Sequence, residues 1–137
     1  MRVALVLITM LVAQMAWAQE GGVLLKVGPY IEFANAEHDF GDISQGDKVQ
    51  HTFAFKNSGT EPLILSNVLV TCGCTATDWP KQPIMPGENK ELTVSFDSTG
   101  KVGRQNKVIT IVSNATNSQE RVKIVTNILP KGSFNRL

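Results

Sequence analysis

Residues 49–62 read Val49-Gln50-His51-Thr52-Phe53-Ala54-Phe55-Lys56-Asn57-Ser58-Gly59-Thr60-Glu61-Pro62. In residues 49–56 the odd-numbered positions are mostly apolar and the even-numbered positions mostly polar. This period of two is typical of a β-strand with one buried face. Residues 57–62 favour a turn, because Gly readily adopts positive φ and Pro cannot donate to a strand ladder. The stretch therefore predicts a strand followed by a reversal of the chain.

The same pattern recurs on both sides of this stretch, with turn-forming residues between the segments. Further strands are expected at residues 31–40, 63–71, 92–96, 107–113 and 121–128. Residues 63–71 are apolar on both faces, which predicts a central strand covered on both sides or a strand beside an interface. Several short strands separated by Gly, Pro and Asn turns indicate a single all-β domain, an antiparallel sandwich.

The first residues indicate export. Arg2 supplies a positive charge, residues 3–12 are almost entirely apolar, and Ala16-Trp17-Ala18 provides the small residues at a peptidase site. This arrangement predicts a cleavable signal peptide over residues 1–18. Gln14 interrupts the apolar stretch well short of the roughly 20 residues that span a bilayer, so no membrane insertion of the mature chain is expected. The mature protein is predicted to be periplasmic or extracellular.

The charge of the chain is nearly balanced, with 13 Lys and Arg against 12 Asp and Glu. There is no basic stripe and no acidic tail, which argues against nucleic acid or an anionic membrane as a partner. Hydrophobic residues make up 42% of the sequence, enough to support a packed core.

Cys72 and Cys74 are the only cysteines, separated by Gly73. In an extended strand their Cα atoms would lie roughly 6.5 Å apart, near the upper limit for a disulfide, and Gly73 would let the backbone buckle to close the gap. Four interpretations follow: a disulfide, two buried reduced cysteines, a metal site, or a nucleophilic cysteine. A metal site would suit copper(I) or zinc, with His51 or Met85 as a third ligand.

His51 is the candidate third ligand because of the expected topology. It lies near the start of one predicted strand, whereas the cysteines lie at the end of the next. Antiparallel strands bring these two ends to the same pole of a sandwich. The sequence therefore predicts a cluster of Cys72, Cys74 and His51, with Trp79 in the segment nearby.

Catalytic patterns are missing from the sequence. Carboxylates are spread through predicted turns without a close pair, and there is neither a Gly-x-Ser-x-Gly elbow nor a phosphate-binding Gly-rich loop. We therefore expect no enzyme, no catalytic residue and no cofactor, with copper or zinc at the Cys-Gly-Cys motif as the alternative.

A set of residues spread over most of the chain carries a family resemblance. In chain order they are Phe33, His38-Asp39-Phe40-Gly41, Gly46, Phe53-Ala54-Phe55-Lys56-Asn57-Ser58-Gly59, Pro62-Leu63, Cys72-Gly73-Cys74-Thr75, Pro83-Ile84-Met85-Pro86-Gly87-Glu88 and Ser113-Asn114. Together they resemble the DUF1573 family over about residues 33–129. The resemblance implies a small exported bacterial domain with an immunoglobulin-like β-sandwich, similar to the motile-sperm-protein and cilia-associated modules.

These observations divide the chain into four parts: a signal peptide (1–18), an N-terminal lead segment (19–32), an immunoglobulin-like domain (33–130) and a C-terminal tail (131–137). The function expected for the domain is that of a non-catalytic module of the cell envelope, acting in protein binding or structural support. Its partner would be another envelope protein. The alternative is a metal-binding or thiol-redox protein that uses the Cys-Gly-Cys motif.

Overall fold

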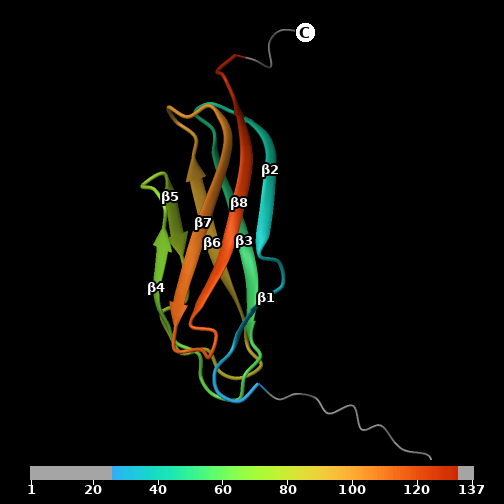
Figure 1. The fold of residues 1–137 in the computed structure, drawn as a ribbon, viewed down its shortest axis with the longest axis vertical. Helices are drawn as coiled ribbons and strands as arrows, with labels where there is room; N and C mark the ends of the chain where they lie inside the picture. The colour runs from blue at the N-terminus through green and yellow to red at the C-terminus, as the bar shows by residue number, and fades with distance from the viewer. Residues whose placement is uncertain (1–25, 133–137) are drawn as a thin grey trace, which may run out of the picture.

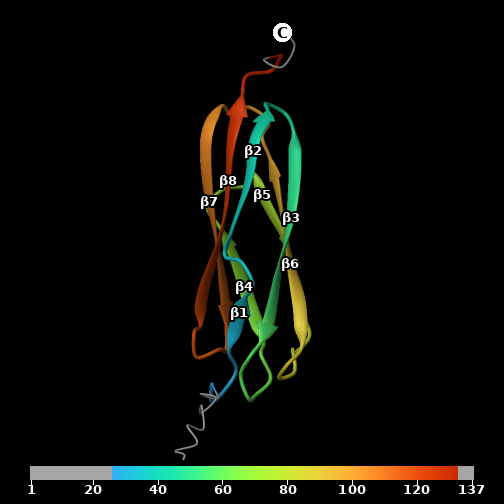
Figure 2. The same cartoon turned by 90° about the vertical axis from the view of Figure 1, so that its right-hand side faces the viewer.

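A computed structural model describes residues 26–132 as two β-sheets packed face to face (Figures 1 and 2). The strands are β1 (Ile31–Phe33), β2 (Glu37–Ser44), β3 (Lys48–Asn57), β4 (Leu65–Val70), β5 (Thr75–Asp78), β6 (Asn89–Asp97), β7 (Gly103–Ser113) and β8 (Gln119–Leu129). The predicted signal peptide, residues 19–25 of the lead segment and residues 133–137 of the tail lie outside the described residues. Within residues 26–132, no helix is long and apolar enough to cross a bilayer.

Each sheet has four strands. The orders are β1-β3-β6-β5 and β2-β8-β7-β4. All neighbouring strands are antiparallel except β2 and β8, which run parallel. Both of these strands point from the pole where the N-terminal segment enters toward the pole where the chain leaves (Figure 2). The predicted immunoglobulin-like β-sandwich is confirmed.

The core follows from the period of two along the strands. Alternate side chains of β3 and β6 point inward from one sheet, and alternate side chains of β7 and β8 meet them from the other. The fully buried side chains include Phe53, Phe55, Leu92, Val94, Phe96, Ile109, Ile111, Ile124 and Ile128. Burying an apolar side chain of this size contributes about 1.5–3 kcal/mol, so this alternation is the main source of the sandwich's stability.

Three strand predictions need correction. The strand expected over residues 31–40 is divided into β1 and β2, which belong to opposite sheets because the chain crosses between them after Phe33. Residues 63–71 do not form a central strand, since β4 is the last strand of its sheet and leaves Leu69 49% exposed. The short strand β5 was not predicted, because Thr75–Asp78 is too brief to show an alternation.

Amide side chains tie the turns together at the pole where the N-terminal segment enters. Asn57 is fully buried, and its Oδ1 accepts hydrogen bonds from the backbone N–H groups of Tyr30 and Gly59. Its Nδ2 donates to the carbonyl oxygens of Glu61 and Ile84 at 2.8 and 2.9 Å. One side chain thus holds four backbone groups from three separate segments.

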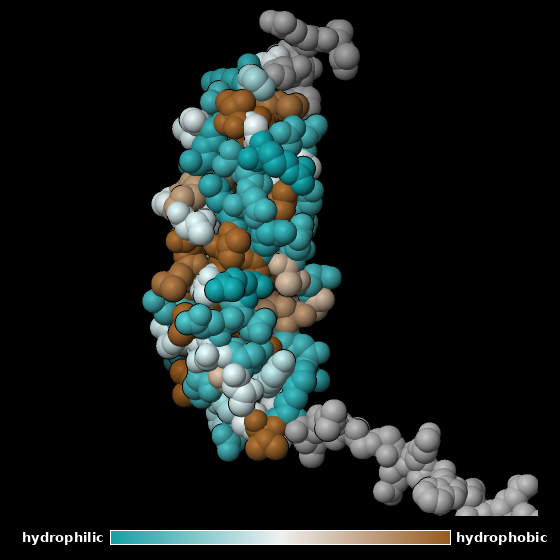
Figure 3. All heavy atoms as spheres, viewed as in Figure 1, coloured by the Kyte–Doolittle hydropathy of each residue, from teal (hydrophilic) through white to brown (hydrophobic). Residues whose placement is uncertain are grey.

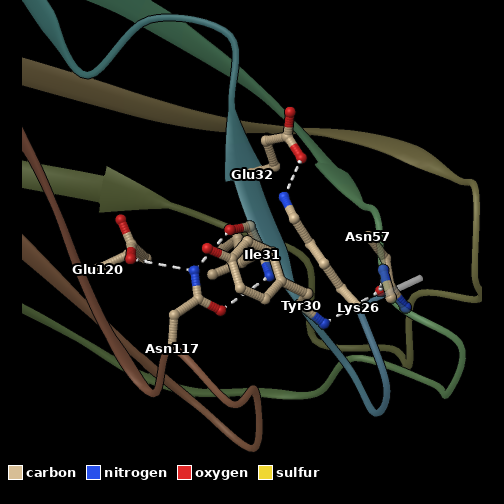
Figure 4. Close-up of polar contacts among 8 residues, drawn as sticks. Lys26, Tyr30, Ile31, Glu32, Asn57, Asn117 and Glu120 are labelled. Atoms are coloured by element: carbon tan, nitrogen blue, oxygen red, sulfur yellow. Dashed lines mark hydrogen bonds and ion pairs between the residues drawn. The ribbon is translucent and has the colours of Figure 1, made fainter. Parts of the chain in front are cut away.

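The side-chain amide of Asn117 binds the backbone of β1 in a similar way. Its Oδ1 accepts from the N–H of Ile31 at 3.1 Å, and its Nδ2 donates to the carbonyl of Ile31 at 2.7 Å and to Glu120 at 3.0 Å (Figure 4). The amide therefore imitates the peptide of a neighbouring strand. Glu32 on the same short strand forms an ion pair with Lys26 at 2.8 Å. This exposed pair links the entering segment to β1.

Candidate functional site

Cys72 and Cys74 are joined by a disulfide in the structure, with their Cα atoms 5.3 Å apart. This separation is shorter than that of an extended strand, because the backbone turns here. The N–H of Thr75 donates to the carbonyl of Cys72 at 3.3 Å, which brings the two cysteines together around Gly73. Both cysteines are partly buried.

The disulfide lies where the chain leaves one sheet and enters the other. It follows β4 at the edge of its sheet and precedes β5 at the edge of the opposite sheet. The carbonyl of Cys74 accepts from the N–H of Asp97 at 2.9 Å, which anchors the crossing on β6. A surface hollow of about 290 Å³ beside the bridge is lined in part by Cys74, Lys48 and Asp97. The half-buried Cys74 thus adjoins open surface on this side.

Removing the disulfide is expected to cost little stability. The bridge closes a loop of only a few residues, for which the chain-entropy relation gives about 1.5 kcal/mol. The double variant Cys72→Ser, Cys74→Ser should lower the free energy of unfolding by about this amount in urea titrations. Wild type in a reducing agent serves as the control and should show a similar loss. Complete unfolding of the reduced protein would contradict the expectation.

The predicted cluster of Cys72, Cys74 and His51 is not assembled. His51 on β3 pairs with Val94 on β6, which in turn pairs with Thr77 on β5. The carbonyl of Cys74 accepts a hydrogen bond from the N–H of Asp97, three positions after Val94 on β6. The backbones of His51 and Cys74 are therefore on the order of 14 Å apart. His51 and the cysteines lie apart because β3 and β4 belong to opposite sheets and are not neighbours.

No alternative metal cluster takes its place in the described part of the chain. Across residues 26–132, no three His, Cys, Asp or Glu side chains are placed to hold a metal ion together.

His51 instead stacks on His38. The two ring centroids are 3.6 Å apart and the rings are inclined by only 5°. Phe40 meets the edge of His38 and Phe53 meets the edge of His51, both with centroids 4.6 Å apart. Because His38 belongs to β2 and His51 to β3, the stack joins the two sheets along one side of the sandwich. In the sequence each histidine stands two residues before a Phe, but only the apposition of β2 and β3 reveals the pair.

The environment of His51 disfavours its charged form. Partial burial lowers the pKa of the His51 imidazole from its usual value, and the neighbouring His38 lowers the same pKa further through charge repulsion. The folded state therefore prefers neutral His51, whereas in the unfolded chain the imidazole takes up a proton with an ordinary pKa of about 6.5.

We expect the stability of the protein to fall as the pH drops through this range. At a pH above the pKa that His51 has in the unfolded chain, the imidazole is neutral in both states and the free energy of unfolding is at its full value. As the pH falls toward the lower folded pKa, the unfolded chain binds the proton first and the free energy of unfolding decreases. Thermal unfolding of wild type and His51→Phe between about pH 7.5 and about pH 5 checks this. The variant should lose less stability over this interval, and equal slopes would contradict the expectation.

A second surface feature lies just after β5. The Nζ of Lys81 sits 3.0 Å from the ring centroid of Trp79, a cation–π contact. A hollow of about 400 Å³ adjoins this ring and is lined by Asp78, Trp79, Pro80, Lys90, Glu91 and Thr93. Trp79 is partly buried against the core, which limits its freedom to move. We call Trp79, Lys81 and the lining of this hollow the Trp79 platform.

Comparisons with solved structures show the same architecture in several proteins. A protein of unknown function from Porphyromonas gingivalis W83 has a TM-score of 0.64 and 19% identity, with 74% of this chain and 47% of that chain covered. This chain thus spans about half the length of that protein. PapD-like domain 7 of human CEP192 has a TM-score of 0.57 and 11% identity, covering 73% of this chain and 85% of that one. The Escherichia coli chaperone DraB has a TM-score of 0.50 and 11% identity, covering 77% and 57%.

These identities are low, so the likeness shows the fold and not an activity. No curated protein matches the sequence. A family model described as "Protein of unknown function (DUF1573)" matches residues 31–128. Because this match covers well over half of the chain, the protein belongs to the DUF1573 family.

Proposed function

We propose that this protein is an exported, non-catalytic module of the cell envelope that binds another protein through the Trp79 platform. The observation that carries the proposal is a tryptophan held by a cation–π contact beside a hollow lined by charges of both signs. The chaperone-like sandwich fold is compatible with such a role. Export rests on the predicted signal peptide and on the family resemblance.

The chemistry of the platform suits a protein partner. Tryptophan is enriched among residues that dominate binding energy, because it buries a large area with few rotatable bonds. The partner would place an apolar side chain against Trp79. Asp78, Lys90 and Glu91 around the hollow would then orient it through complementary charges, which affect association rate and specificity more than affinity.

In-cell crosslinking tests the proposal. The full-length protein with a C-terminal affinity tag is produced in its own host, crosslinked in the intact envelope, purified and analysed by mass spectrometry. Wild type should capture a reproducible partner, and Trp79→Ala should lose most of it while remaining folded at the temperature of the experiment, as circular dichroism of the purified variant checks. Val27→Ala is the matched control, because Val27 is 77% exposed at the entering pole and should keep the partner.

Two outcomes would overturn the proposal: a wild type that captures no reproducible protein, or a Trp79→Ala variant that captures as much as the control. Export is checked in the same preparation. The mature protein is expected to begin at Gln19, and a purified chain that keeps its first 18 residues would contradict cleavage.

A second candidate function is thiol–disulfide exchange, favoured by the partly exposed bridge beside an open hollow. A thiolate of a partner protein would attack one sulfur of the bridge, forming a mixed disulfide while the other sulfur leaves as a thiolate. The nearby Lys48 ammonium would favour that leaving thiolate. In the reverse direction, the single thiolate left in Cys74→Ser or Cys72→Ser would attack a disulfide of the oxidised partner, forming the mixed disulfide while the partner's other sulfur leaves as a thiolate. Because the variant lacks the second cysteine that would resolve this species, acid quenching with thiol alkylation should trap it. A bridge that stays intact through repeated exposure to envelope thiols would rule the exchange out.

A further inference from the structure

We infer that β4 pairs with β4 of a second copy of this chain, so that one continuous sheet runs through two sandwiches. The pairing goes beyond the proposed function, because it uses the edge of the β2-β8-β7-β4 sheet and not the Trp79 platform.

The orientation of the β7 backbone shows which groups of β4 face outward. The N–H of Ser113 donates to Ser118 on the β8 side at 3.0 Å, whereas the N–H of Asn114 donates to Ile64 on the β4 side at 3.1 Å. Backbone groups alternate along an antiparallel strand. Thr110, an even number of positions before Asn114, therefore points its backbone N–H and C=O toward β4.

Leu69 is the register partner of Thr110 and so directs its own N–H and C=O back toward β7. Its neighbours Val68 and Val70 then present their N–H and C=O groups away from the sheet. The N–H of Val68 agrees with this, because it donates at 2.9 Å to the Oδ1 of Asn67 and not to β7. The carbonyl of an added strand can replace that exposed side-chain acceptor.

Apolar side chains also accumulate along this edge. Leu69 is 49% exposed, Ile64 44% and Val70 37%. Figure 3 shows an apolar area at mid-height on the side of the molecule where β4 and β7 lie. An open edge with exposed apolar side chains is a surface that native proteins usually protect from other strands.

The charges on the strands identify the occupant. Each of the other three edge strands carries acidic residues, namely Glu32 on β1, Glu37 and Asp39 on β2, and Asp78 on β5. By contrast, residues 63–77 contain no charged side chain at all. An uncharged apolar strand is complementary to another uncharged apolar strand, and within residues 26–132 the other edges of this chain are not of that kind. A second β4 meets the requirement.

The exposed backbone groups determine the register. In an antiparallel pair with a two-fold axis at Leu69, the N–H and C=O of Val68 exchange hydrogen bonds with Val70 of the copy, and Val70 does the same with Val68. Leu69 then lies directly opposite Leu69 of the copy at a non-hydrogen-bonded position, where Cα atoms are about 4.5 Å apart. The two leucines would cover each other on the outer face of the sheet.

Sedimentation velocity of the purified mature protein over a wide dilution series tests this pairing. Wild type should be dimeric at high concentration and dissociate on dilution, as expected for a contact at the small end of the interface range. Leu69→Lys places two ammonium groups at the axis and should keep the protein monomeric throughout. Met85→Lys and Val102→Lys are matched controls, since these side chains are 49% and 53% exposed elsewhere, and both should remain dimeric.

Amide hydrogen exchange on wild type gives a second test that needs no variant. The N–H groups of Val68 and Val70 should exchange more slowly at high protein concentration than at low concentration, and other edge amides such as those of β5 should not change. A wild type that is monomeric at every concentration overturns the inference, as does a Leu69→Lys variant that dimerises like the controls. The crosslinking experiment with wild type and Trp79→Ala does not depend on whether the chain dimerises. Failure of the β4 pairing and failure of the Trp79 platform proposal are therefore distinguishable.

Discussion

Replacing Asn57 by alanine is expected to lower the free energy of unfolding by about 3–5 kcal/mol. The substitution removes both hydrogen-bonding ends of a fully buried amide. It leaves the N–H groups of Tyr30 and Gly59 and the carbonyls of Glu61 and Ile84 without this partner. Each buried polar group that loses its partner costs about 1–3 kcal/mol. Urea unfolding followed by tryptophan fluorescence or circular dichroism measures the loss.

Two further variants separate hydrogen bonding from side-chain volume. Asn57→Asp keeps the shape and the acceptor for two N–H groups, but it turns a carboxylate oxygen toward the carbonyls of Glu61 and Ile84, so a loss of similar size is expected. Asn106→Ala is the control, because Asn106 is exposed on β7 and should change stability by less than about 0.5 kcal/mol. A loss at Asn57 no larger than this would show that the amide network is not essential.

Gly59→Ala is expected to destabilise the protein by at least about 3 kcal/mol. A Cβ at this position would overlap the carbonyl oxygen of Gly28 and lie 2.6 Å from the backbone nitrogen of Tyr30. Both are main-chain atoms and cannot turn aside as a flexible side chain would. The entering segment would have to move away, which breaks the 2.8 Å hydrogen bond from the N–H of Thr60 to Gly28.

Limited proteolysis and urea unfolding check this prediction together. The variant should be cut within residues 26–30 under conditions in which wild type is resistant, because displacement exposes that segment. Gly73→Ala is the matched control, since a Cβ there would meet nothing within 4 Å. Equal stability of the two variants would contradict the steric argument.

The local pattern of the sequence was sufficient for most of the fold. Alternation between apolar and polar residues predicted β3, β6, β7 and β8 within a few residues, because each has one face on the core. A Pro-Gly pair favours a turn, because Pro presets φ and Gly adopts positive φ. The structure has Gly87, after Pro86, at φ 84°, with the N–H of Glu88 donating to the carbonyl of Met85. Alternation cannot say which sheet a strand joins. It therefore missed the crossing between β1 and β2 and left open whether β4 is a central strand or a strand beside an interface.

The candidate site was harder to predict for the same reason. Cys72 and Cys74 are close in sequence, so their proximity was evident without a fold. The stack of His51 on His38 depends on which strands of opposite sheets face each other, a non-local property. The predicted cluster of His51 with Cys72 and Cys74 was wrong because it required β3 and β4 to be neighbours, whereas they belong to opposite sheets.

The parallel pairing of β2 with β8 has a mechanical consequence. The chain enters the described domain at one pole and leaves it at the other, and both strands point toward the exit (Figure 1). A pull between the two ends therefore slides β2 and β8 past each other along their length. Their hydrogen bonds would have to yield together, whereas a peeling force would open them one at a time. Tension applied between the two ends of the domain would thus act in its most resistant direction.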